Sequence, residues 1–142
     1  MIVRFAWFLL AVLIATASGS LVQSLFNLAA LQGIGAPIPV LLWLQTIIHD
    51  LIGFAPLYAA VVLVSFALAF PVAALVASVV PRWRSLVFAA AAATAIAVAF
   101  QIANASLPMP TLIAATRTLP GLLAMMACCA VAGWAYTRGV KP

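Results

Sequence analysis

The chain has 142 residues, of which 69% are hydrophobic and 5% are charged, and its mean hydropathy is +1.35. Soluble domains are about half apolar and about a quarter charged, so this composition excludes a soluble fold, a disordered chain and a nucleic-acid-binding domain. Six Lys and Arg residues against one acidic residue give a net charge of +5. That charge reflects the scarcity of carboxylates, and the class that remains is an integral membrane protein.

Charged residues divide the sequence into long apolar stretches. A transmembrane helix needs about 20 apolar residues, so the chain has room for four or at most five spans and no soluble domain. We expect an all-α integral membrane fold, an antiparallel four-helix transmembrane bundle, in a single membrane domain that covers residues 1–142. The charge-free stretches place the spans at about 4–31, 55–79, 84–105 and 118–137.

The first span has some features of a secretory signal peptide. Arg4 precedes an apolar run, and the small residues 15–17 are typical of a cleavage site. The apolar character nevertheless continues to Leu31, beyond the length of a signal peptide. We therefore expect an uncleaved membrane helix.

The segment between the first two spans predicts an amphipathic helix at about residues 38–53. It follows a turn rich in Gly and Pro, and its apolar part is too short to cross a membrane. Gln45, Thr46, His49 and Asp50 share one helical face, while leucine and isoleucine cover most of the rest. We expect this helix to lie at the extracytoplasmic surface.

Basic residues set the expected orientation. Only Arg117 falls on one side of the predicted spans, and the other five basic residues fall on the opposite side: Arg4, Arg82, Arg84, Arg138 and Lys141. Cytoplasmic segments carry the excess of Lys and Arg in membrane proteins. Both termini are therefore predicted to be cytoplasmic, and we expect a bacterial inner-membrane location.

The last two spans carry many small residues. Alanine fills positions 89–93 of the third span, which favours close helix contacts and predicts a central packing helix. The fourth span begins near Thr118, which is expected to be the N-cap, with Pro120 in the first turn.

Polar side chains gather in the half of the bundle that is predicted to be outer. Thr16, Ser20, Gln23 and Asn27 form one stripe along the first span, and such a stripe is costly to expose to lipid. The same half holds further polar or ionisable residues: His49, Asp50, Tyr58, Gln101, Asn104 and Arg117. Asp50 and Arg117 are the outer side's only acid and only base, and we expect them to form an ion pair.

Two interpretations of this outer cluster stay open. In the first, the polar groups join helices by hydrogen bonds. In the second, they line a cleft that binds a quinone or a lipid. The candidate ligand-binding residues are His49, Asp50, Arg117, Gln23, Asn27, Tyr58, Gln101 and Asn104.

Few residues offer catalytic or metal chemistry. The chain has one His and no Glu, and Cys128 and Cys129 are neighbours in an apolar run, where we interpret them as packing residues. We expect no metal site, no intrinsic cofactor and no catalytic activity. An intramembrane enzyme that uses His49 and Asp50 is a minor alternative.

The sequence therefore predicts a small integral-membrane subunit that anchors or completes a larger membrane complex, with an outer-leaflet quinone or lipid pocket. Its expected partners are membrane lipids and other membrane subunits or further copies of itself, without nucleic acid. The alternative is a homo-oligomeric channel or transporter for an uncharged small solute. In that case Thr16, Ser20 and Gln23 would line a water-filled path that continues toward Arg82.

Overall fold

The computed structural model describes residues 1–35, 37–106 and 114–140, which form helices and no strands. Four of the helices in these ranges are long and apolar enough to cross a membrane, as the sequence predicts. They are α1 (Ile2–Gly33), α3 (Ala55–Val79), α4 (Arg84–Ser106) and α5 (Leu119–Gly139). The shorter elements are the apolar helix α2 (Val40–Gly53) and two 3-10 helices, η1 (Pro81–Trp83) and η2 (Ala114–Arg117).

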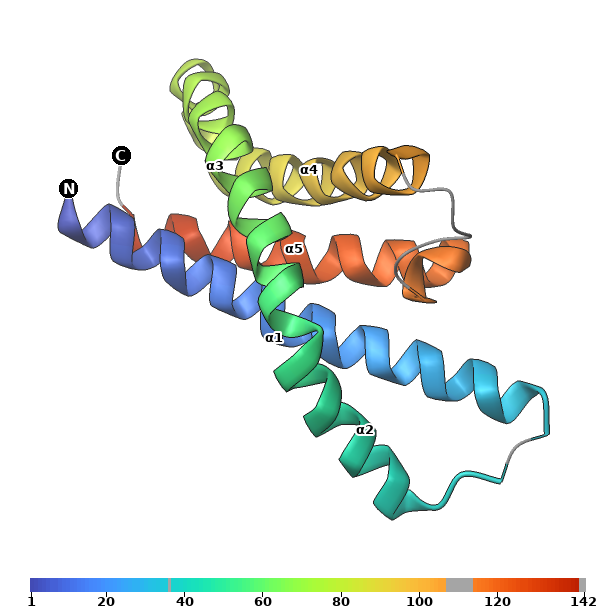
Figure 1. Cartoon of the computed structure of the whole chain (residues 1–142). Helices are drawn as coiled ribbons and strands as arrows, with labels where there is room; N and C mark the ends of the chain where they lie inside the picture. Colours follow the sequence, from blue (N-terminus) through green and yellow to red (C-terminus); the bar gives the residue numbers. More distant parts are fainter. Residues whose placement is uncertain (36, 107–113, 141–142) are drawn as a thin grey trace.

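Three of the long helices lie side by side, and the fourth crosses them. Figure 1 shows α5 running opposite to both α1 and α4, while α3 crosses this group steeply. Helix α2 leads almost end to end into α3 because Phe54, between them, keeps helical backbone angles (φ −86°, ψ −40°). Helices α1, α4 and α5 therefore form a layer that α3 packs across.

Helix α5, and not α4, is the central packing helix of the layer. It contacts both α1 and α4 extensively, which corrects the expectation based on the alanine run of the third span. A glycine makes the approach of α4 feasible: a Cβ at Gly133 would lie 2.5 Å from the carbonyl oxygen of Phe88 and 2.9 Å from the Cβ of Ala92. The missing side chain at Gly133 therefore allows α5 to approach α4 closely at this contact.

The start of α5 follows the sequence prediction. Thr118 has an extended backbone (φ −120°, ψ 146°), and its Oγ1 accepts a hydrogen bond of 3.2 Å from the Gly121 N–H. Pro120 lies in the first turn, where its missing N–H would have no helical partner. The predicted cap is confirmed.

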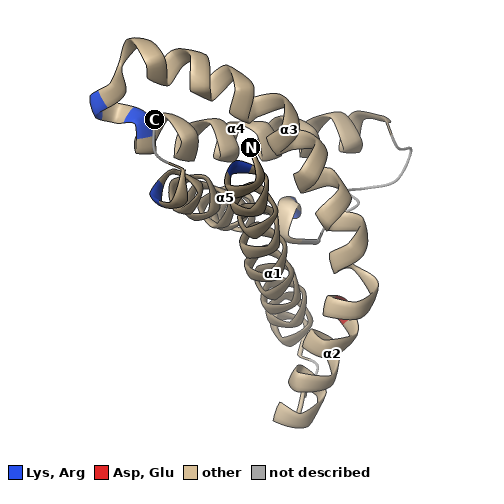
Figure 2. Cartoon of the chain, turned by 90° about the vertical axis from the view of Figure 1, so that its left-hand side faces the viewer, with Lys and Arg blue, Asp and Glu red and all other residues tan. Residues whose placement is uncertain are grey.

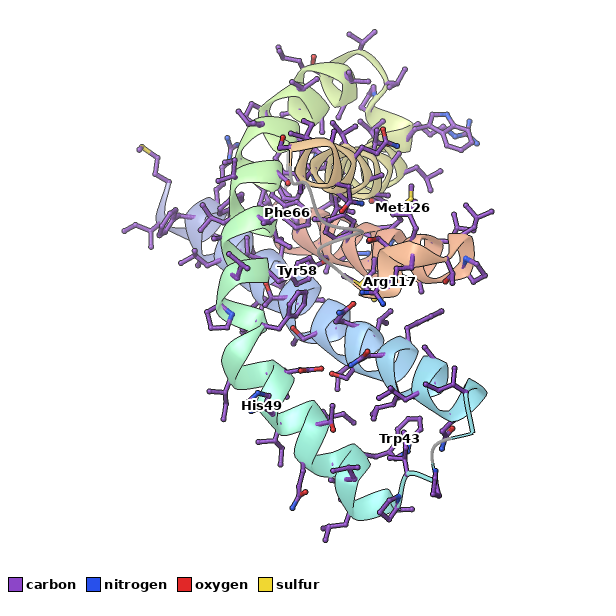
Figure 3. All side chains as sticks on the ribbon, turned by 45° about the vertical axis from the view of Figure 1, so that its right-hand side comes forward. Trp43, His49, Tyr58, Phe66, Arg117 and Met126 are labelled. Carbon is purple, nitrogen blue, oxygen red and sulfur yellow. The ribbon has the colours of Figure 1, made fainter. Side chains whose placement is uncertain are left out.

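The core lies where α3 crosses the layer. Tyr58 and Phe66 are almost completely buried and point from α3 toward α1 and α5 (Figure 3). Phe70 extends this aromatic core, with ring centroids 5.3 Å from Phe88 and 4.8 Å from Tyr136. These contacts hold α3 against the start of α4 and the end of α5.

One end of the molecule holds the start of α1, the end of α5 and most of the basic residues, whereas the single acidic residue lies on α2 (Figure 2). Here Arg84, the first residue of α4, donates a hydrogen bond of 2.6 Å from Nη1 to the carbonyl oxygen of Val140, just after α5. The hydroxyls of Ser85 and Thr137 lie 3.0 Å apart. The start of α4 is therefore held against the end of α5, at what we call the basic end.

Candidate functional site

Polar side chains on and next to the stripe of α1 form hydrogen bonds with η2 and with α2. Gln23 Oε1 accepts a hydrogen bond of 2.8 Å from the Ala115 N–H and so holds η2 against α1. Ser24, the next residue, donates a hydrogen bond of 2.7 Å to Asp50 Oδ2 and so holds α2 against α1. We did not predict Ser24 as a partner, although its spacing of four from Ser20 places the two on one helical face.

The deeper part of the stripe faces the interior of the chain. Thr16 is 7% exposed and Ser20 is fully buried, and their hydroxyl oxygens have no hydrogen-bond partner among the described residues. A buried polar group without a partner costs about 1–3 kcal/mol, so both hydroxyls lower the stability of the fold. Their burial also removes them from the surface that faces lipid or a second copy of the chain.

Tyr58 is the most deeply packed of the predicted site residues. It is 1% exposed, and its hydroxyl oxygen lies 3.6 Å from the sulfur of Cys129, which is itself fully buried. Its ring also fills the space beside Gly19, where a Cβ would overlap it. In this arrangement Tyr58 joins α3 to α1 and α5.

The three ionisable candidates lie on two separate elements. His49 is exposed and Asp50 is half-buried on α2, which packs against α1 and α3. Arg117 is exposed at the end of η2, which packs against α1 and α5. Figure 3 shows His49 on α2 and Arg117 beside α1 on η2. The ion pair between Asp50 and Arg117 stays a prediction.

The three remaining candidates are amides near the ends of α1 and α4. Asn27 and Asn104 are half-buried, and Gln101 is exposed. None of the eight predicted ligand-binding residues lines either of the two cavities described next. Their role in binding a quinone or lipid stays a prediction.

The first cavity is an open groove of about 800 Å³ between α3 and α4, called here the α3/α4 groove. Its α3 side includes Val64, Leu68 and Val72, and nearly all of its surface is apolar. Helix α4 contributes an alanine at every fourth position: Ala91, Ala95, Ala99 and Ala103. The sequence contains this spacing, but its alanine run at 89–93 predicts a contact inside the bundle and not a groove wall.

The second cavity, of about 400 Å³, lies at the basic end and is called here the basic-end pocket. It is formed where four helices start or end. Its polar lining comes from Arg4 of α1, Ser78 of α3, Arg84 of α4 and Tyr136 of α5. In the sequence alone, membrane orientation accounts for both arginines, because residues 4 and 84 are far apart along the chain.

Neither metal chemistry nor a known relative identifies the site. Among the described residues, no group of three His, Cys, Asp or Glu side chains comes together to hold a metal ion. Comparison of the chain with known protein families, with curated proteins and with solved structures finds no match. A functional conclusion therefore depends on the two cavities and the polar contacts themselves.

Proposed function

We propose that this chain is an integral-membrane subunit that binds an apolar transmembrane helix of a partner protein in the α3/α4 groove, and so completes a larger membrane complex. The groove and its alanine wall carry this proposal. Helices associate in lipid mainly through van der Waals packing, and small residues allow their backbones to approach closely. The wall from Ala91 to Ala103 extends for about 18 Å, more than half of a hydrocarbon core of about 30 Å.

The lining of the groove favours a helix over a polar small molecule. Quinones and other polar ligands are oriented by a few well-placed hydrogen-bonding groups. Ser65 and Thr94 are the hydroxyl residues of the lining, and the Ser65 hydroxyl already donates to the Val61 carbonyl oxygen at 2.8 Å. A helix satisfies its own backbone groups and needs no such donors.

The same proposal includes an orientation and a compartment. The chain would be an antiparallel bundle in the bacterial inner membrane, with both termini cytoplasmic and α2 on the extracytoplasmic side. The clustering of basic residues at one end of the helices supports this orientation (Figure 2). The surface position of α2 is supported by its lack of buried residues and by the exposure of Gln45 and His49 on its polar face.

An outer-leaflet quinone or lipid pocket is a separate proposal, and helix binding in the groove does not require it. A homo-oligomeric channel has less support. Thr16 and Ser20, the hydroxyl residues of its expected path, are buried within one copy of the chain, so they would not line a pore between copies.

Site-specific photocross-linking tests the partner helix. A photoreactive side chain replaces Val98, which lines the groove and is 47% exposed, and in a matched variant it replaces Val131, which is 57% exposed on α5. After irradiation of membranes, we expect one discrete adduct with a different membrane protein from position 98 and none from position 131. If position 98 instead cross-links two copies of this chain, the helix in the groove comes from a second copy and not from a different protein. Absence of any protein adduct there would contradict helix binding.

A further inference from the structure

The basic-end pocket lies at the boundary where the apolar helices stop. Arg4 is in the first turn of α1, Ser78 is in the last turn of α3, and Arg84 begins α4. If these helices cross a membrane, their common end is at the level of the lipid headgroups. Val79 and Trp83 beside the pocket are 80% and 57% exposed, so apolar surface continues outward from it.

Two arginines in this pocket lack a side-chain carboxylate to neutralise them. The chain has one acidic residue, Asp50, which lies on α2 and accepts a hydrogen bond from Ser24 of α1. Like charges that share a pocket repel each other, and an anion between them removes this cost. The anion that balances Arg4 and Arg84 would therefore come from outside the chain's side chains.

Hydrogen-bond donors for such an anion are already in place. Arg84 uses Nη1 for the carbonyl oxygens of Val140 and Thr137, and its guanidinium lies over the Phe88 ring at 5.4 Å. A guanidinium has five N–H donors, and among the described residues no hydrogen bond uses its Nε or Nη2. These anchoring contacts hold Arg84 in the wall of the pocket with donors to spare.

We infer that the basic-end pocket binds the phosphate group of an anionic phospholipid. Arginine forms strong charge-assisted hydrogen bonds with phosphate oxygens, and basic pockets between membrane helices on the cytoplasmic side suit anionic headgroups. The acyl chains would lie along the exposed apolar surface of α3 next to the pocket. This inference is distinct from the partner-helix proposal, because Arg4 and Arg84 line the basic-end pocket and not the α3/α4 groove.

Native mass spectrometry of the purified full chain tests the inference, with phosphatidylglycerol and phosphatidylcholine as probes. We expect the unmodified chain to retain phosphatidylglycerol in preference to phosphatidylcholine. Arg4→Gln should weaken phosphatidylglycerol binding by about five-fold or more, the effect of one basic residue near a membrane surface. The matched control is Arg138→Gln, which removes a charge at the same end from a side chain stacked on Trp134 at 4.3 Å, outside the pocket lining.

Three results would overturn the inference. If Arg4→Gln and Arg138→Gln weaken phosphatidylglycerol binding equally, the lipid is attracted by the overall positive charge of this end and not by the pocket. Equal retention of the two lipids would show no preference for an anionic headgroup. If inorganic phosphate raises the melting temperature of the chain as much as phosphatidylglycerol does, the pocket takes a soluble anion and not a lipid. Arg4→Gln should also leave cross-linking from position 98 unchanged. That measurement separates this inference from the partner-helix proposal.

Discussion

Ser24 donates the side-chain hydrogen bond that joins α1 to α2. Its hydroxyl is fully buried and lies within hydrogen-bond distance of two acceptors, the Asp50 carboxylate at 2.7 Å and the Ser20 carbonyl oxygen at 3.1 Å. A hydrogen bond to a charged group contributes about 1.5–3 kcal/mol, more than one between neutral groups. None of the residues of α2 is buried, so this contact has a large share in attaching the helix.

Ser24→Ala should therefore loosen α2. We expect the free energy of unfolding to fall by about 1–3 kcal/mol, because the half-buried Asp50 carboxylate loses its donor. Equilibrium unfolding in mixed detergent micelles measures this loss, and hydrogen exchange should increase along Val40–Gly53.

Ser18→Ala is the matched control for that variant. The Ser18 hydroxyl donates only to carbonyl oxygens of its own helix, Ile14 at 2.6 Å and Ala15 at 3.4 Å. Its removal should leave exchange in α2 unchanged. If both variants had the same effect on α2, the Ser24–Asp50 bond would not be what attaches it.

At the scale of elements, α4 has two faces with different roles. Phe88, Ala92, Ile96 and Phe100 are buried and follow one another at every fourth position, toward the core. The alanines that line the α3/α4 groove repeat with the same period, offset by one residue. One helix thus packs Phe88, Ile96 and Phe100 inward and presents alanines to the α3/α4 groove.

Ala95→Leu should block the partner helix and leave the chain folded. The added side chain would point into an open groove of about 800 Å³ and not into the packed core, so we expect an unchanged melting temperature in detergent. Cross-linking from position 98 to the partner should drop strongly, because bulk at a small-residue contact separates the two helix backbones. Ala90→Leu is the control, since Ala90 is exposed on α4 outside the groove lining. Retained cross-linking in Ala95→Leu would argue against a close helix contact.

The helices themselves were predictable because the signals that produce them are local. Apolar length and the positions of charges predicted four spans, and the Thr118 cap with its nearby proline predicted the start of α5. Contacts between helices depend on three-dimensional geometry that no local pattern contains. Gln23 reaches a backbone N–H 92 residues away, and the close approach of α5 to α4 uses the space left beside Gly133.

The candidate site was harder to predict than the fold for the same reason. The sequence drew attention to polar residues, since these are rare in an apolar chain. The structure gives Gln23, Asp50 and Tyr58 contacts that join elements. Both cavities instead depend on shape: one on the divergence of α3 from α4, the other on four helix ends that bring Arg4 and Arg84 together.

On the scale of the whole molecule, charge and shape support the same orientation. The end that gathers Arg4, Arg82, Arg84 and Arg138 also carries the start of α1 and the end of α5 (Figure 2), and the turn between α1 and α2 lies far from it (Figure 1). Positive charge retained on the cytoplasmic side would place that turn outside.

Cysteine labelling in bacterial spheroplasts tests this orientation. The two variants are Ile34→Cys and Val80→Cys. Ile34 lies next to that turn and is 80% exposed, and Val80 lies between α3 and η1 and is 39% exposed. A membrane-impermeant maleimide should label position 34 in intact spheroplasts and position 80 only after permeabilisation. The unmodified chain is the control, and it should stay unlabelled because Cys128 and Cys129 lie within α5. The reverse pattern would put the basic end outside, and the phospholipid in its pocket would then belong to the outer leaflet.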